Sequence, residues 1–294
     1  MRKLLLLLLA AVSLSAFAQQ NPPQPTDQNV RTGVLENGLT YYVRQNSMPE
    51  NRADFYIAQK VGSMQEEDSQ AGLAHFLEHM AFNGTTNFPG KTMLNYLQDN
   101  GIKFGTNINA YTSFDETVYY VSNVPTTNQN LVDSVLLVLY DWSCGIALEE
   151  EEIESERGVI REEWRTRGGA QQRLWETLLP IMYPNSKYAH RMPIGDIDVI
   201  NNFHPDEIRA YYKKWYRPDL QGIIIVGDFD AEDMEKRVVE LFGKIPMPEN
   251  AAVREYFEVP DNEEPIVAFA TDTEATNTQI LIFHKHEPIP DEIK

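Results

Sequence analysis

The stretch AGLAHFLEHMAFNGT, residues 71–85, combines a helical repeat of apolar side chains with two histidines and a glutamate. His75 and His79 are four residues apart, so on a helix they lie on one face, one turn apart. Both imidazoles can then reach a single zinc ion at about 2.0–2.1 Å. Glu78 lies beside His79, where its carboxylate can take a proton from a metal-bound water. The apolar residues of the stretch predict that this helix packs on a core.

Turn signals and apolar repeats on both sides of this helix predict a mixed fold. Strands are expected at residues 30–35 and 39–44, joined by an Asn37-Gly38 turn, and at 53–61, 104–112, 117–124 and 220–226. Helices are expected at residues 69–81, 91–98, 130–142, 149–167, 171–179, 205–215 and, capped by Asp230, up to Phe242. This order predicts an α+β fold, a two-layer sandwich of a mostly antiparallel sheet packed by helices.

The first residues of the 294-residue chain predict export. Arg2 and Lys3 precede an apolar run, and Ala16-Phe17-Ala18 supplies the small residues of a cleavage site. The run is too short to span a bilayer comfortably, and no later segment approaches a transmembrane span. We therefore expect a signal peptide over residues 1–18 and a periplasmic or extracellular mature protein.

The composition of the remaining chain predicts four further segments. Residues 19–29 are rich in Gln, Pro and Asn and are expected to be a flexible leader. Residues 30–247 hold the predicted sandwich, and the Pro- and Glu-rich residues 248–264 are expected to be a linker. Two strand-like stretches, 265–270 and 278–284, suggest that residues 265–294 begin a second, truncated α+β domain.

The charge of the chain excludes some partners. A formal net charge of −19 argues against nucleic acid and anionic membrane surfaces, because polyanions are bound through lysine and arginine. It suits metal ions and basic peptides, although solubility explains an acidic surface equally well. The single cysteine, Cys144, excludes an intramolecular disulfide, so the core must hold the domain together.

Two more segments accompany the histidine motif: NINAYTSFDETVYY at residues 107–120 and EIESERGVIREEW at residues 152–164. Together with residues 71–85 they resemble the inverted-motif zinc peptidases of the pitrilysin and insulysin family, which includes the mitochondrial processing peptidases. The three segments occur in the order and at the spacing of that family, and the resemblance runs from about residue 30 to residue 247. It implies that residues 30–247 form a catalytic half-chamber domain.

The resemblance also implies roles for individual residues. His75 and His79 match the two histidine ligands of one zinc ion, and Glu78 matches the general base. The third ligand in the family is a glutamate on a later helix, and aligning the E-x-E-R-x-V-I pattern places Glu154 there, with Glu156 as the alternative. These two glutamates point about 200° apart around a helix, so only one of them can bind the metal.

The other acidic residues of the same helix are expected on a solvated face, although one of them is available to orient a histidine. These residues are Glu149, Glu150, Glu151, Glu152, Glu162 and Glu163. Relatives can carry a further glutamate one or two turns before the ligand. Counting seven residues back from Glu154 gives Ala147, so that position is expected to be empty, with Glu150 or Glu151 as the alternatives that could substitute.

A peptidase must also hold an extended substrate. Asn109, Ala110 and Tyr111 match the edge strand of the family, and the resemblance implies that substrate adds to this strand through backbone hydrogen bonds. The alternative is an ordinary sheet edge. Three residues after the motif helix are candidates for lining the cleft: Phe82, Asn83 and Phe88.

These observations together predict an exported zinc endopeptidase that cleaves oligopeptides or small unfolded proteins with a metal-activated water. The alternatives are a non-catalytic partner or scaffold subunit of the same family, and a periplasmic metal- or peptide-binding module. Family enzymes enclose a chamber between two homologous halves, so a C-terminal half or a separate partner subunit is expected to complete this one. We therefore expect residues 1–294 alone to bind zinc and to cleave peptides poorly.

Overall fold

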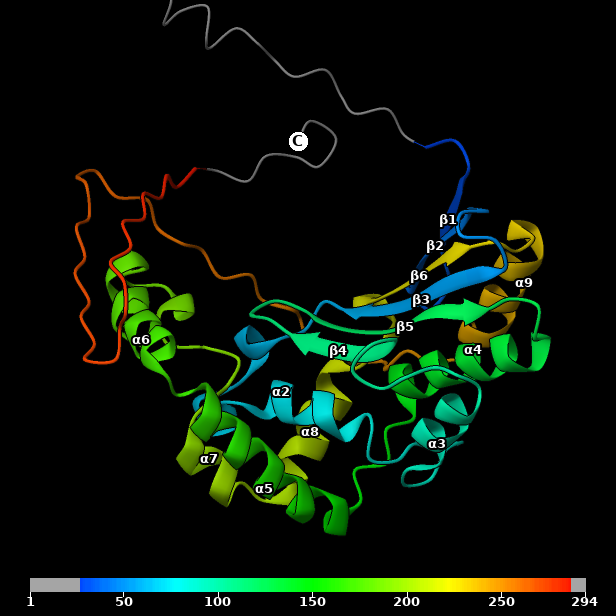
Figure 1. Cartoon of the computed structure of the whole chain (residues 1–294), viewed down its shortest axis with the longest axis horizontal. Helices are drawn as coiled ribbons and strands as arrows, with labels where there is room; N and C mark the ends of the chain where they lie inside the picture. Colours follow the sequence, from blue (N-terminus) through cyan, green and yellow to red (C-terminus); the bar gives the residue numbers. More distant parts are fainter. Residues whose placement is uncertain (1–26, 287–294) are drawn as a thin grey trace, which may run out of the picture. The chain divides into compact units, whose positions relative to one another are not determined.

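A computed structural model describes residues 27–286 of the chain (Figure 1). The expected signal peptide and most of the expected leader lie outside the described residues. Residues 29–279 form one compact unit, and residues 280–286 group separately. In the described part of the chain, no helix is both long enough and apolar enough to cross a membrane.

A six-stranded sheet forms one layer of the compact unit, in the order β1-β2-β6-β3-β5-β4. Its strands are β1 (Val30–Val34), β2 (Thr40–Gln45), β3 (Arg52–Gln59), β4 (Ile108–Thr112), β5 (Thr117–Pro125) and β6 (Gln221–Gly227). Every neighbouring pair is antiparallel except β2 and β6, which run parallel. The prediction of a mostly antiparallel sheet is therefore confirmed, and β4 lies at one edge.

Local sequence explains the strands well. Side chains of β3 and β6 alternate between buried and half-buried, and Phe55, Ile57 and Ile223 are completely buried. This alternation is what a half-covered sheet requires. The hairpin of β1 and β2 turns at Gly38, whose φ of +91° favours glycine. The side-chain amide of Asn37 donates to the backbone carbonyls of Phe242 and Ile245, both at 2.9 Å.

Helices form the second layer, except for α6, which stands to the side of the sheet (Figure 1). They are α2 (Leu73–Met80), α3 (Thr92–Asp99), α4 (Gln129–Cys144), α5 (Glu150–Arg167), α6 (Ala170–Met182), α7 (Ile197–Asn202), α8 (Pro205–Trp215) and α9 (Ala231–Phe242). Helix α4 packs on β3 and β5, α9 packs on β2, and α2 packs on β4, α5 and α8. The expected two-layer α+β fold is confirmed.

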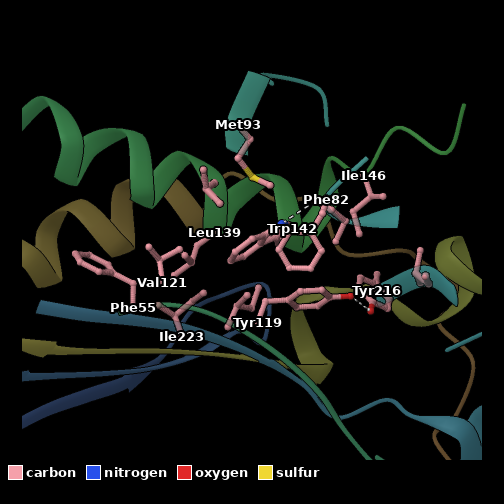
Figure 2. Close-up of a cluster of buried hydrophobic side chains, with 14 of the residues drawn as sticks. Phe55, Phe82, Met93, Tyr119, Val121, Leu139, Trp142, Ile146, Tyr216 and Ile223 are labelled. Atoms are coloured by element: carbon pink, nitrogen blue, oxygen red, sulfur yellow. Dashed lines mark hydrogen bonds between the residues drawn. The ribbon is translucent and has the colours of Figure 1, made fainter. Parts of the chain in front are cut away.

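The core between the layers holds the end of α2 against the sheet (Figure 2). Trp142 of α4 stacks on Tyr119 of β5 with ring centroids 5.3 Å apart. The indole N–H of Trp142 donates to the carbonyl of Ala81 at 3.0 Å, and the hydroxyl of Tyr119 bonds that of Tyr216 at 2.7 Å. Because buried polar groups cost free energy when unpaired, the Trp142 bond holds the end of α2 against α4, and the tyrosine pair joins β5 to the end of α8.

The structure differs from the prediction at the start of α2 and at α7. The helix expected from residue 69 begins only at Leu73, after a 3-10 turn at Asp68–Gln70. Gly72 separates the two, because its φ of +103° is incompatible with an α-helix. Helix α7 was not predicted from the sequence, since its six residues are too few to show a periodic pattern.

The strands expected at residues 265–270 and 278–284 are not formed. Residues 251–286 contain no helix or strand, and large apolar side chains there are exposed, including Phe269 at 85% and Ile282 at 93%. A strand needs a neighbour to satisfy its backbone, and no strand in the described part of the chain pairs with these residues. The boundary near residue 247 and the second domain stay predictions.

Candidate metal centre

The start of α2 is fixed by a carboxylate from the preceding turn. Gly72 has no side chain with which to cap the helix, and Glu66 supplies the missing acceptor. Its oxygens accept the backbone N–H groups of Gly72 at 3.1 Å and Ala74 at 2.8 Å. Complete burial raises the pKa of Glu66 to about 8 in spite of these bonds. Glu66 thus anchors the turn from which His75 extends.

His75, His79 and Glu163 converge on one point. The Nε2 atom of His75 lies 3.6 Å from Oε1 of Glu163, and Nε2 of His79 lies 3.2 Å from Oε2. Candidate ligand atoms of the three residues all lie within 4.8 Å of one another. Two imidazoles and one carboxylate around an open position fit the ligand set of a catalytic zinc site, which keeps a fourth place free.

Glu154, the predicted third ligand, is not part of this group. Its side chain is 54% exposed and pairs with Arg157 on the same helix, with oxygens 2.9–3.1 Å from the guanidinium. Arg157 is itself buried, donating to the carbonyls of Ile200 and Phe203 at 2.6 Å. These bonds hold Glu154 on the flank of α5 that faces away from the histidines, so the structure places Glu163, and not Glu154, beside them.

Glu156, the alternative ligand, lies beside the group but bonds Nδ1 of His79, whereas Nε2 of His79 is the atom that faces Glu163. Its Oε1 is 2.8 Å from Nδ1 of His79, and its Oε2 accepts the side-chain amide of Asn83 at 2.5 Å. A carboxylate on the outer nitrogen of a ligating histidine fixes the tautomer and the ring orientation. Glu156 therefore lies where it can orient His79, outside the group of candidate ligands.

Glu78 extends from the same helix toward the cleft and the edge strand. The hydroxyl of Thr112, the last residue of β4, donates to Oε2 of Glu78 at 2.5 Å. Burial raises the pKa of Glu78, and the bond from Thr112 opposes that rise. A carboxylate that is easily protonated and lies beside a metal site is suited to moving protons.

The pKa values of the two histidines are shifted in opposite directions. Burial and, to a smaller extent, the neighbouring charge of His79 lower the pKa of His75 to about 4, so His75 is a neutral donor near pH 7. Burial also lowers the pKa of His79, but hydrogen bonds with Glu156 and Glu163 outweigh it and raise the pKa to about 9. The hydrogen bond from His79 lowers the pKa of Glu163 to about 2. A metal ion that binds here must displace the proton of His79, so its affinity depends on pH.

A cleft of about 540 Å³ opens in front of these residues. Its wall includes all three residues of the predicted substrate strand, Asn109, Ala110 and Tyr111, which lie on edge strand β4. The remaining lining residues are Thr112, His75, Glu78, His79, Phe82, Asn83, Lys91, Leu94, Phe104, Glu156, Val159, Glu163, Arg167, Pro193 and Ile194. Phe88 packs on the core instead.

Sequence reasoning missed Glu163, Lys91 and Arg167 among these residues. Glu163 was expected on a solvated face. The signal that could have found it is its seven-residue spacing from Glu156, which puts the two carboxylates on one face of a helix. With Glu163 as ligand, the position seven residues upstream is Glu156 and not Ala147, so the position expected to be empty is filled.

Comparison with known families agrees with this geometry. Residues 41–191, which include every residue of the group, match insulinase, peptidase family M16. The chain belongs to family M16. Residues 202–292 match a second profile, the M16 inactive domain. In this family member, α8, β6 and α9 lie within that second match, yet β6 completes the first sheet between β2 and β3.

Individual relatives of this M16 chain carry protease names. It is 37% identical over 222 residues to "Probable zinc protease PqqL" of Escherichia coli, covering 76% of this chain and 24% of that protein. The protein of the same name from Haemophilus influenzae is 37% identical over 260 residues, which cover 88% of this chain and 27% of that protein. A solved structure is also similar: the crystal structure of the first half of the periplasmic protease PqqL from E. coli. It superposes with a TM-score of 0.76 at 36% identity, and the match covers 81% of this chain and 50% of that chain. The chain thus spans about a quarter of the length of these curated relatives.

Proposed function

We propose that this chain is the zinc-binding, catalytic part of an exported endopeptidase that cleaves oligopeptides or small unfolded proteins. The observation that carries the proposal is the convergence of His75, His79 and Glu163 beside Glu78, at a cleft bordered by an edge strand. The ligand set fits zinc, and the relatives in E. coli and H. influenzae are named zinc proteases.

The roles of the residues follow from their positions. When bound, zinc polarises a carbonyl and lowers the pKa of water to about 7. Glu78 accepts the proton of the attacking water and delivers it to the leaving amine, a role that suits a carboxyl whose pKa is raised by burial. Thr112 holds Glu78 next to β4, so the base keeps a fixed position relative to a peptide bound on that strand. Glu156 keeps the His79 ring in its ligating orientation.

Strand β4 is the proposed substrate-binding element. It pairs with β5 on one side and is the edge of the sheet on the other, and Asn109, Ala110 and Tyr111 line the cleft. A peptide that adds to this edge is bound mainly through its backbone, which suits extended chains of varied sequence. Strand addition requires a free, extended stretch of backbone, which oligopeptides and unfolded segments offer most readily, so these are the expected substrates.

Backbone methylation of a peptide tests this mode of binding. Methylating one amide that points to β4 is expected to raise KM about tenfold, because it removes a hydrogen bond and adds a clash. The next amide along an extended peptide points the opposite way, so its methylation is the matched control and is expected to have little effect. Equal effects at alternate amides, measured over a series of singly methylated peptides, would contradict strand addition.

Export and a completing half are part of the proposal. Arg2, Lys3 and the apolar run after them support a signal peptide, and the E. coli relative of known structure is described as periplasmic. That structure covers the first half of its protein, and this chain covers 50% of it. We propose that a further half, in the same protein or in a partner subunit, closes the chamber over the cleft.

Metal dependence of cleavage tests the function. Purified chain is expected to bind one zinc ion and to cleave a quenched-fluorescence peptide slowly, with loss of cleavage on chelation and recovery on adding zinc. The measurements are zinc content by elemental analysis and initial rates with the chain in excess over peptide. Chain that retains zinc yet shows no zinc-dependent cleavage under these conditions would contradict the peptidase and favour a metal- or peptide-binding module.

A further inference from the structure

The outer nitrogens of the two metal-site histidines are held differently. His79 Nδ1 lies 2.8 Å from Oε1 of Glu156. His75 Nδ1 is buried and has no hydrogen-bond partner among the described residues. Because the bond made by the outer nitrogen sets which nitrogen is free for a metal, the orientation of His79 depends on what holds Glu156.

Glu156 is held by a second bond on its other oxygen. The side-chain N–H of Asn83 donates to Oε2 at 2.5 Å, and the Glu156 side chain is only 12% exposed. With both oxygens bonded, the carboxylate cannot rotate without breaking a contact. Asn83 is therefore the residue that fixes the plane of the carboxylate.

The orientation of the Asn83 amide is in turn selected by a lysine. Lys91 donates from Nζ to Oδ1 of Asn83. An ammonium has only donors, so it requires the amide oxygen and leaves the amide nitrogen for Glu156. A reversed amide would set N–H groups against the ammonium and an oxygen against the carboxylate. Lys91 thus determines which end of Asn83 meets Glu156.

A loop that does not depend on the metal brings Lys91 to Asn83. The two residues flank residues 84–90, and buried Asp141 of α4 holds that loop. Asp141 accepts the Thr85 hydroxyl at 2.5 Å, the Asn87 backbone N–H at 2.8 Å and the Asn87 side-chain amide at 2.7 Å. Lys91 is therefore held near Asn83 by the loop itself.

We propose that Lys91 and Asn83 are positioning residues that orient His79 through Glu156. The proposal rests on the zinc site of the proposed function. Without the ammonium, the Asn83 amide is free to turn, and Glu156 loses the contact that fixes its plane. His79 then enters the metal site in several orientations, which weakens binding and alters the coordination geometry.

Replacing Lys91 with methionine tests the relay, because it removes the donor and keeps an unbranched apolar stem. The zinc dissociation constant of Lys91→Met, measured by competition with a chromophoric chelator, is expected to rise about tenfold. The visible spectrum of the cobalt-loaded variant is expected to change as well. Lys91→Arg keeps donors at this place and is expected to restore most of the affinity. Lys236→Met on α9, whose partner Glu232 is exposed, is the matched control and is expected to change nothing.

The outcomes separate the relay from the site on which it rests. If Lys91→Met binds zinc as tightly as the wild type while His75→Ala loses zinc, the relay is wrong and the zinc site stands. If His75→Ala also keeps wild-type affinity, the proposed site itself fails. A lower melting temperature of metal-free Lys91→Met would assign Lys91 a structural role and overturn the relay, because this exposed side chain is expected to leave the fold unchanged.

Discussion

Glu163→Gln is expected to bind zinc more than a hundredfold more weakly than the wild type and to lose zinc-dependent peptide cleavage. Glutamine lacks the negative charge that balances the metal, and one of three protein ligands is lost. If zinc binding contributes about 10 kcal/mol, a third of it corresponds to a loss of more than two powers of ten. Competition with a chromophoric chelator measures the affinity directly.

Glu154→Gln is the matched control for this experiment. It makes the same chemical change on the same helix, and Glu154 is paired with an arginine as Glu163 is with Arg167. Zinc affinity and cleavage are expected to stay at the wild-type level, because Glu154 faces away from the histidines. The reverse result, with zinc lost in Glu154→Gln and kept in Glu163→Gln, would show that the third ligand is the one expected from the sequence pattern.

Glu78→Gln is expected to keep zinc and to lose cleavage. Glu78 does not belong to the group that can hold the metal, so the dissociation constant for zinc should change little. General acid–base catalysis contributes about 10²–10⁴-fold, and the rate constant for cleavage is expected to fall by that factor. Initial rates on a quenched-fluorescence peptide, at saturating zinc, provide the measurement.

Exposed Glu67 supplies the control for Glu78→Gln, since Glu67→Gln removes a carboxylate of the same charge outside the cleft. It is expected to cleave at the wild-type rate. Glu78→Gln that still cleaves at the wild-type rate would rule out Glu78 as the general base. Unaltered cellular function of that variant would favour the non-catalytic alternatives, a scaffold subunit or a binding module.

Most secondary structure was predictable because its signals are local. The Asn37-Gly38 turn, the alternation in β3 and β6, and the Asp230 cap of α9 depend on residues that are close in sequence. Predictions failed where a local pattern needed a distant partner. The stretches at 265–270 and 278–284 have strand-like composition, yet no strand of the described residues pairs with them.

The residues of the candidate site were likewise predictable only where they lie close together in sequence. His75, Glu78 and His79 come from one helix, so the spacing of three and four residues was enough to place them together. On α5, spacing alone was not enough. Ile153, Arg157 and Ile160 form its buried stripe, and that stripe has two flanks.

The sequence by itself determined the motif helix, the six strands of the sheet and the fact that α5 carries acids on both flanks of its buried stripe. Only the tertiary structure decided which flank meets α2. Glu156 and Glu163 lie on the flank that faces the histidines, and Glu154 lies on the other, tied to Arg157. The rotation of a helix about its axis depends on the surfaces against which it packs, and these surfaces come from residues far away along the chain.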